Sequence, residues 1–237
     1  MAMAGETIKA EAICLDIRPW SRTSHVVSWL TPMGKVATVV KGAVRAKSQF
    51  LGQYDLNYTC DILYYARAKG ELHALRECVP LEIREELRND YRKLALAGYM
   101  RRLVAELAPQ GEDCGAWYDF LAQRLSSLIP HPSSLVRFEL EVLKLSGLAP
   151  DFSKYDRNAE WSAFSVETGN FGSGEGRCIR VSLETAEYLA NGAKNAKNLQ
   201  IPLDAARVIG VFYQFHLDCA SDVRRTVLEM ISSSKEG

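Results

Sequence analysis

The side chains best suited to chemistry in this sequence are cations gathered near the amino terminus. Between Ile17 and Tyr54 the chain carries six Lys and Arg residues and no Asp or Glu. A random share of the chain's 29 acids would put roughly five there. The six cations are Arg18, Arg22, Lys35, Lys41, Arg45 and Lys47. Because the formal net charge of the chain is +0, any affinity for a polyanion has to come from this patch.

Aromatic residues are interleaved with these cations. Trp20, Phe50 and Tyr54 are candidate stacking residues, whereas Trp29 is expected in the core of the fold. A cationic groove with aromatic faces is the combination that single-stranded nucleic acid needs. The alternative interpretation is a set of ordinary charges that protects strand edges and keeps loops solvated.

Motifs for catalysis and for metal binding are absent from the sequence. G-x-S-x-G, H-E-x-x-H and G-x-x-x-x-G-K-[ST] do not occur, and the glycine-rich GNFGSGEG (169–176) lacks the Lys-Ser/Thr of a phosphate-binding loop. Because these motifs are absent, we expect no enzyme activity and no cofactor. The six cysteines form no C-x-x-C pair, so we expect no zinc and instead buried thiols in a reducing cytoplasm. Neither a secretory leader nor a run of ~18 apolar residues is recognised, so we expect no membrane span.

Short strands are predicted up to about residue 80 and would position the cations. Two of them flank the turn Thr-Pro-Met-Gly at 31–34 and read as a hairpin. Five short strands in about 80 residues predict a small β-barrel of the OB type. The predicted strands contain the alternating Ile13, Leu15 and Ile17 and then residues 25–30, 35–41, 54–66 and 71–78.

After Pro80 the apolar period becomes helical. The pattern predicts a helix over 83–108 with two buried stripes, the second formed by Leu87, Tyr91 and Leu94. Further helices are predicted around 117–128, from Ser134 to a cap at Gly147, from Ser182, from Pro202 with Val208, Phe212 and Phe215 on one face, and over 223–231. Residues 150–181 are predicted to be an irregular insert with a β-hairpin, packed through Phe152, Trp161, Phe164 and Phe171.

The predicted fold class is therefore α+β, with three parts. An OB-fold nucleic-acid-binding domain covers 1–80, and an α-helical domain covers 81–149 and 182–237. The insert at 150–181 interrupts the helical domain.

The order of these elements brings out a family resemblance. The stretch RPWSRTSHVVSWLTPMGKVATVVKGAVRAKSQFLG resembles the amino-terminal signature of the RecO family of bacterial recombination mediators. That signature has an R-P-[YW] turn, a strand ending in Leu-Thr, a Gly-Lys hairpin and then Lys-Gly-x-x-Arg-x-Lys-Ser. GELHALRE, VRFELEVLKLSGLAPDF and a late VRR fit the later landmarks, so the resemblance spans nearly the whole chain.

The resemblance implies a non-catalytic mediator of DNA repair in the bacterial cytoplasm, associated with the nucleoid. Such a protein binds single- and double-stranded DNA, anneals strands and, with RecR, loads RecA onto strands coated by single-stranded-DNA-binding protein (SSB). Carried over to this chain, Lys41, Arg45 and Lys47 are phosphate contacts, and Arg18, Arg22 and Lys35 extend their track.

The family resemblance also implies a partner site on the helical domain. Arg137 is the candidate to pair with the SSB tail, which is acidic and ends in an apolar aromatic residue. An ordinary solvated helix charge is the alternative for Arg137.

Two departures from the family pattern are visible. Many RecO-like proteins carry two C-x-x-C pairs in the insert, where this chain has Cys178 alone, so we expect an insert that is zinc-finger-like but without zinc. The terminal LDCASDVRR lacks the usual Gly/Pro turn and Lys-Ser-Arg motif, which weakens the assignment of Arg224 and Arg225 as DNA contacts.

Two other functions stay open at this point. In the first, the protein is an adaptor that binds SSB tails, and its barrel is purely structural. In the second it is an RNA-binding OB protein, because phosphate contacts alone do not distinguish the two sugars.

Overall fold

The chain folds into two compact units in the computed structural model, which describes residues 6–67, 72–110, 113–172, 176–217 and 221–233. The first unit contains Met1–Asp90 and Val104–Ser127, and the second contains Tyr91–Leu103 and Leu128–Gly237. The division falls inside helix α1 (Tyr91–Leu107). In the described ranges, no helix combines the length and the hydropathy needed to cross a bilayer.

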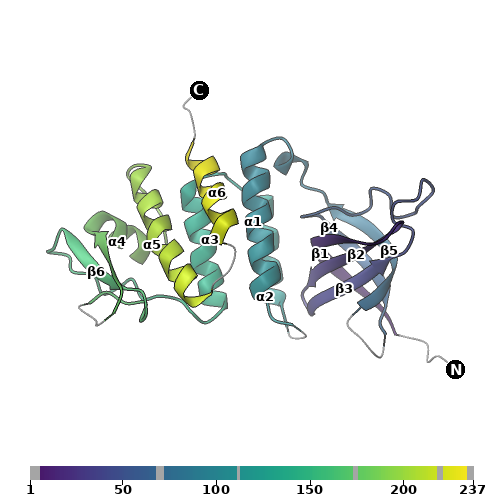
Figure 1. The fold of residues 1–237 in the computed structure, drawn as a ribbon, viewed down its shortest axis with the longest axis horizontal. Coiled ribbons are helices and arrows are strands. Elements are labelled where there is room, and N and C mark those ends of the chain that lie inside the picture. Colours follow the sequence, from purple (N-terminus) through teal and green to yellow (C-terminus); the bar gives the residue numbers. More distant parts are fainter. Residues whose placement is uncertain (1–5, 68–71, 111–112, 173–175, 218–220, 234–237) are drawn as a thin grey trace. The chain divides into compact units, whose positions relative to one another are not determined.

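Five strands in the first unit form a closed barrel in the order β1–β2–β3–β5–β4 (Figure 1). They are β1 (Thr7–Ser21), β2 (Ser24–Thr31), β3 (Gly34–Val40), β4 (Thr59–Tyr65) and β5 (Leu72–Glu82). Among the described pairings of these five strands, that of β3 with β5 is parallel and the others are antiparallel. The predicted barrel and its 31–34 turn are confirmed, although the strand predicted over 54–66 begins only at Thr59. Residue 71 and the Ala-Lys-Gly loop lie outside the described residues.

Strand β1 pairs on both sides because a bulge bends it. Its amino-terminal part pairs with β4 and its carboxy-terminal part with β2, and the register shifts between Cys14 and Asp16. A bulge adds one residue and increases the local twist, which helps the sheet to close. Cys14 belongs to the barrel core before the bulge and Ile17 packs against it afterwards. Ile13 and Leu15 are also fully buried, but they lie outside this cluster.

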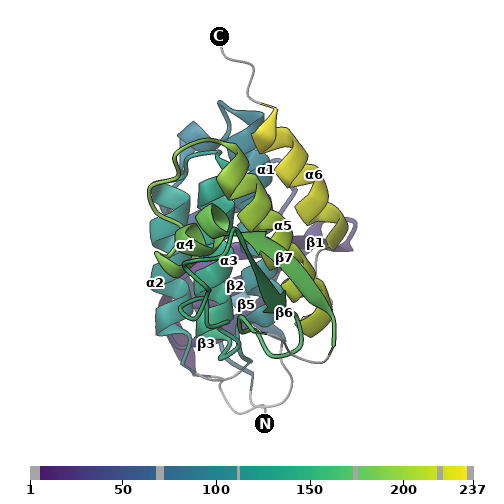
Figure 2. The same ribbon diagram turned by 90° about the vertical axis from the view of Figure 1, so that its left-hand side faces the viewer.

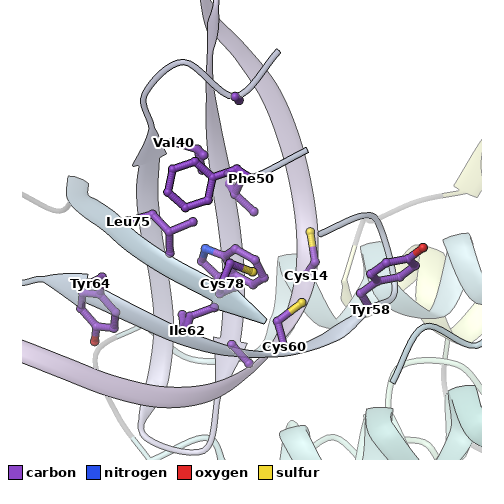
Figure 3. Packing of buried hydrophobic residues seen from close by; sticks show 13 residues of the cluster. Cys14, Val40, Phe50, Tyr58, Cys60, Ile62, Tyr64, Leu75 and Cys78 are labelled. Atoms are coloured by element: carbon purple, nitrogen blue, oxygen red, sulfur yellow. The ribbon is translucent and has the colours of Figure 1, made fainter. Parts of the chain in front are cut away.

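The barrel core is built around Trp29, as predicted. Its indole is fully buried and donates a hydrogen bond to the Thr38 hydroxyl at 2.8 Å. The surrounding side chains are mostly aliphatic, aromatic and thiol groups (Figure 3). The buried members are Ala12, Cys14, Val27, Trp29, Val40, Ala43, Phe50, Tyr58, Cys60, Ile62, Tyr64, Leu75 and Cys78.

Helix α2 (Gly115–Ser126) belongs to the same unit as the barrel. Its buried stripe includes Trp117 and Leu121, as predicted. The Tyr118 hydroxyl donates to the Glu11 carboxylate at 2.5 Å, which ties the helix to β1. Burial, followed by this hydrogen bond, raises the pKa of Tyr118.

The helix predicted over 83–108 begins only at Tyr91, because the backbone conformation at Arg84 is not helical. Arg84 adopts a left-handed conformation (φ 50°, ψ 55°) ahead of the short 3-10 helix η1 (Glu85–Leu87). Its buried guanidinium donates to the Asn57 carbonyl at 2.6 Å, to Glu82 at 2.7 Å and to the Ser126 hydroxyl at 3.3 Å. These contacts hold the conformation that a helix cannot accommodate.

The predicted second buried stripe of that helix is also wrong. Tyr91 is 67% exposed and Leu94 is 47% exposed, whereas Leu87 is buried but lies in η1. The buried residues of α1 form one broad face and are Leu96, Ala97, Tyr99, Met100, Leu103 and Val104. One apolar face is sufficient for a helix that packs on one side.

The second unit contains four complete helices and a two-stranded hairpin in its described residues (Figure 2). They are α3 (Pro132–Leu145), β6 (Trp161–Ser165), β7 (Cys178–Ser182), α4 (Leu183–Ala190), α5 (Gln200–His216) and α6 (Ser221–Ser232). Gly147 takes a φ of 73° directly after α3, which confirms the predicted cap. Phe215, predicted on the buried face of α5, is 50% exposed.

The hairpin is held by packed aromatic rings. Of the four residues predicted to pack there, Phe152, Phe164 and Phe171 do so. Phe164 stacks on Phe152 at a centroid distance of 5.1 Å and meets Phe171 edge-on at 5.5 Å. Trp161 is instead 44% exposed and lies under the Arg180 guanidinium. Cys178 is also exposed, contrary to the expectation of buried thiols, while Cys14, Cys60, Cys78 and Cys114 are buried. Cys219 lies outside the described residues.

A buried ion pair joins three helices of the second unit. Arg224 of α6 donates to both carboxylate oxygens of Glu139 on α3, at 2.6 and 2.8 Å. The Tyr99 hydroxyl of α1 donates to the same carboxylate at 2.6 Å. Burial alone would lower the pKa of Arg224, but the Glu139 charge outweighs it and the pKa is raised. Arg224 is therefore a structural residue.

Candidate nucleic-acid interface

A surface pocket of ≈ 400 Å³ opens where the β1–β2 hairpin meets the segment after β3. Its lining combines an aromatic ring, two cations, two hydroxyls and apolar or backbone surface. The lining residues are Trp20, Ser21, Ser24, Val39, Lys41, Gly42 and Arg45. The fold thus brings together Trp20, Lys41 and Arg45, three residues that the sequence predicted to contact nucleic acid.

Trp20 reaches the pocket from a second bulge in β1. Pro19 pairs with His25 and Ser21 pairs with Ser24, so Trp20 is the extra residue between them. Bulges re-aim a side chain, and they are common beside functional sites. Trp20 is 62% exposed, and it makes no ring or cation–π contact within the described part of the chain.

The other wall is a tight turn that two backbone N–H groups fix to the hairpin. Gly42 has a φ of +67°, and a Cβ there would lie 3.3 Å from Arg45 Cδ, so the Arg45 side chain folds over the glycine. The Gly42 N–H donates to the Ser24 hydroxyl at 3.3 Å, and the Val44 N–H donates to the Thr23 carbonyl at 3.4 Å. A side chain at position 42 would be strained and would displace Arg45.

The cations around the pocket differ in their partners. Lys41, Arg45, Lys47 and Arg22 are exposed and make no ion pair with any described residue. Arg18 is paired with Asp16, which lies one position before the acid-free window. The positive potential at the pocket therefore comes chiefly from the turn after β3 and the tip of the β1–β2 hairpin.

Lys35 lies away from the pocket, at the start of β3. Its ammonium group donates to the Ala105 carbonyl in the last turn of α1 at 3.0 Å. Burial lowers the pKa of Lys35. A cation at the carbonyl end of a helix stabilises that end, so the structure gives Lys35 a packing role within the first unit.

Phe50 and Tyr54 also differ from the sequence-based expectation of stacking residues. Phe50 is 7% exposed and belongs to the barrel core (Figure 3). Tyr54 is half-buried, its hydroxyl is hydrogen-bonded to His25 Nδ1 at 2.8 Å, and its ring meets Trp29 edge-on at 6.1 Å. Both rings pack against the core, which leaves Trp20 as the exposed ring of the three.

We expect Tyr54 to lose its proton later than an ordinary tyrosine. Burial raises its pKa to about 12, so its protonated form stabilises the fold below pH ~10, and this contribution is lost as the pH rises through about 12. The difference in phenolate absorbance between the wild type and Tyr54→Phe should therefore centre near pH 12. A difference centred near pH ~10 would show a solvated ring.

Sequence reasoning missed Ser21, Ser24, Val39 and Gly42 as parts of the pocket. Ser24 and Val39 are ordinary strand residues, and only their pairing with distant segments places them there. Gly42 carried a local signal, because a glycine directly after a strand and between cations marks a turn with positive φ.

Arg137 lies on α3 in the second unit and is half-buried. Its Nε donates to the Ser133 carbonyl at 3.2 Å, and no carboxylate of the described residues pairs with it. Burial and then the Arg137 charge lower the pKa of His131. Tail binding by Arg137 stays a prediction.

Across the ranges that the structure describes, no three His, Cys, Asp or Glu side chains are grouped closely enough to hold a metal ion.

Two family models match the sequence in succession. Residues 3–84 match the model described as "Recombination protein O N terminal", and residues 88–220 match "Recombination protein O C terminal". The chain belongs to the RecO family. The resemblance seen in the sequence is confirmed, and the N-terminal RecO model covers the described barrel strands.

Individual relatives of this RecO-family chain carry the name "DNA repair protein RecO". The protein from Alkaliphilus metalliredigens is 30% identical over 149 residues, which are 60% of this chain and 59% of that protein. The protein from Moorella thermoacetica is 32% identical over 145 residues, covering 60% of this chain and 54% of that one. The protein from Gloeobacter violaceus is 28% identical over 179 residues, covering 70% and 67%. The first two matches span less than two thirds of those relatives.

Proposed function

We propose that this RecO-family chain is a non-enzymatic, DNA-binding recombination mediator of DNA repair. It binds single- and double-stranded DNA, anneals complementary strands and works with RecR to load RecA onto SSB-coated strands in the bacterial cytoplasm, at the nucleoid. The observation that carries the proposal is the barrel pocket in which Lys41 and Arg45 lie beside the exposed Trp20 without a carboxylate among the lining residues.

Phosphate neutralisation is the proposed source of affinity. Lys41 and Arg45 at the pocket and Lys47 in the same turn segment each contact one phosphate and release its counterions. Arg22 at the hairpin tip extends this track, while Arg18 contributes less because Asp16 already pairs with it. Binding of this kind is independent of base sequence. Annealing follows because the cations screen two strands that otherwise repel each other.

The helical unit supplies the proposed partner contact. Arg137 pairs with a carboxylate of the SSB tail, since no described residue neutralises it and charge-assisted hydrogen bonds to carboxylates are strong. The relatives' shared name places the family in DNA repair. RecR, RecA and SSB enter as proposed partners.

The proposal is tested by the salt dependence of DNA binding. Fluorescence anisotropy of a short labelled single strand, titrated at several salt concentrations, gives the slope of log K against log salt. Replacing Lys41, Arg45 and Lys47 together by alanine should reduce this slope by roughly two, at ~0.7 per phosphate contact. A slope that stays unchanged would move the site elsewhere.

Lys35→Ala is the matched control for the triple variant. It removes a lysine from the same strand and turn region, but one whose ammonium group is already bound to Ala105. Its salt slope should equal that of the wild type.

Two further outcomes favour the alternative functions. Normal binding of an SSB-tail peptide without any DNA affinity at low salt indicates the adaptor, and stronger competition by a matched RNA strand indicates the RNA-binding protein.

A further inference from the structure

We infer that the pocket between Trp20 and Arg45 is a subsite for one unpaired nucleotide, with the base against Trp20, and that it makes the protein prefer single strands to duplexes. This inference rests on the proposed function and adds to it a residue that discriminates between DNA forms. It separates two properties of one surface: phosphate affinity from the cations and strand preference from the ring.

The size and rigidity of the pocket fit a small ligand. Its volume of ≈ 400 Å³ falls in the range of about 300–1,000 Å³ usual for small-molecule sites. The bulge in β1 sets the backbone position of Trp20 on one side, and the bond from the Gly42 N–H to the Ser24 hydroxyl fixes the turn on the other. A site that is formed before binding loses less conformational entropy when the ligand arrives.

The lining matches the three parts of a nucleotide. Trp20 offers an exposed aromatic face for the base, and Lys41 and Arg45 offer cations for the phosphate. The Ser21 hydroxyl, which lines the same pocket, offers a hydrogen-bonding group for the sugar. Stacking on an aromatic side chain is tolerant of base identity because every base has a π-face.

Strand preference follows from the accessibility of the base. In a duplex each base is stacked and paired, and taking it out costs a few kcal/mol. A single strand presents unstacked bases at little cost, so only it can use the Trp20 face. Phosphates are present in both forms, so Lys41 and Arg45 act on both alike.

The test compares three labelled ligands of equal length at one salt concentration: oligo-dT, a strand made of abasic sites and a matched duplex. Trp20→Ala should weaken binding of oligo-dT about 5- to 150-fold, which corresponds to ~1–3 kcal/mol of stacking. Binding of the abasic strand and the duplex should stay within about 2-fold of the wild type. Trp20→Phe should retain most of the oligo-dT affinity, and Lys41→Ala should weaken all three ligands.

Intrinsic fluorescence gives a second readout that does not depend on the alanine variant. Oligo-dT should quench the tryptophan emission of the wild type, and Trp20→Phe should remove that quenching. Thymidine monophosphate as a competitor distinguishes a subsite within a strand from a site for free nucleotide: it should displace oligo-dT only weakly, because it lacks the neighbouring phosphates. Displacement as effective as that by oligo-dT itself would overturn the strand assignment.

Two results separate the inference from the proposal beneath it. If Lys41→Ala weakens DNA binding but Trp20→Ala leaves oligo-dT unchanged, or weakens all three ligands equally, the subsite is wrong and the proposed function stands. If the wild type binds none of the ligands at low salt, both are wrong. Because Trp20 is 62% exposed, the thermal unfolding midpoints of Trp20→Ala and Trp20→Phe should match that of the wild type. Matching midpoints confirm that the variants are folded.

Discussion

Replacing Glu139 by alanine is expected to lower the free energy of unfolding of the second unit by about 3–5 kcal/mol, because it leaves a buried charge without its partner. The Glu139 side chain is fully buried and accepts hydrogen bonds from Arg224 and Tyr99. The guanidinium also donates to the Ala206 carbonyl at 2.6 Å, so it is held in place when the carboxylate is gone. Urea unfolding followed by circular dichroism measures the loss.

Glu141→Ala is the control for this change. It lies on the same helix, but it pairs with Lys144 at 3.4 Å on the surface, and an exposed pair of this kind contributes only ~0–1 kcal/mol. The triple variant Glu139→Leu, Arg224→Met and Tyr99→Phe should recover most of the lost stability, since apolar side chains of similar volume often replace a buried ion pair without cost, and Tyr99→Phe removes the hydroxyl that donates to Glu139. A loss below about 1 kcal/mol for Glu139→Ala would contradict the assigned role of the pair.

Replacing Arg84 by alanine is expected to destabilise the first unit by about 3 kcal/mol, because hydrogen bonds to charged groups contribute ~1.5–3 kcal/mol each and their loss strands buried acceptors. The Asn57 carbonyl loses its bond from the guanidinium, and the Ser126 hydroxyl on α2 loses another. Asn57 is 4% exposed, so water does not readily replace the missing donor. Chemical unfolding gives the stability, and hydrogen exchange in α2 reports whether the helix loosens.

Arg88→Ala provides the comparison for Arg84. Arg88 bonds to Asp55 at 2.7 Å and to the Tyr58 hydroxyl at 2.9 Å, but its side chain is half-exposed. Its loss should cost no more than ~1 kcal/mol. The loss of stability in Arg84→Lys should lie between those of Arg88→Ala and Arg84→Ala, since an ammonium group cannot reach three acceptors with the geometry of a guanidinium. Equal effects of Arg84→Ala and Arg88→Ala would argue against the role given to Arg84.

The barrel was predictable because its signals are local. The turn at 31–34 marked a hairpin through its proline and glycine, and the structure confirms it. The bulge at Leu15 was not predictable, since it has no compositional marker and depends on β1 pairing with two other strands. The break at Arg84 was hidden for a similar reason: its left-handed conformation depends on contacts with Asn57 and Ser126.

The site was predictable in part. Charge and aromatic patterning selected Trp20, Lys41 and Arg45, which the fold brings to one pocket, while their contact with nucleic acid stays a prediction. The same patterning could not separate them from Lys35, whose partner carbonyl lies 70 residues later in the chain. Nor could it separate an exposed ring from one packed on the core, as with Tyr54, because aromatic residues serve both purposes equally well.

The parallel pairing of β3 with β5 has a consequence for the growing polypeptide. Residues 37–39 of β3 find their partners only at 72–74, and β4 also pairs with β5. In a nascent chain emerging from the ribosome, the six cations between Ile17 and Tyr54 are therefore synthesised before the barrel can close. The proposed contact with a polynucleotide should begin only once synthesis has passed Glu82, because the barrel cannot close before β5 is made.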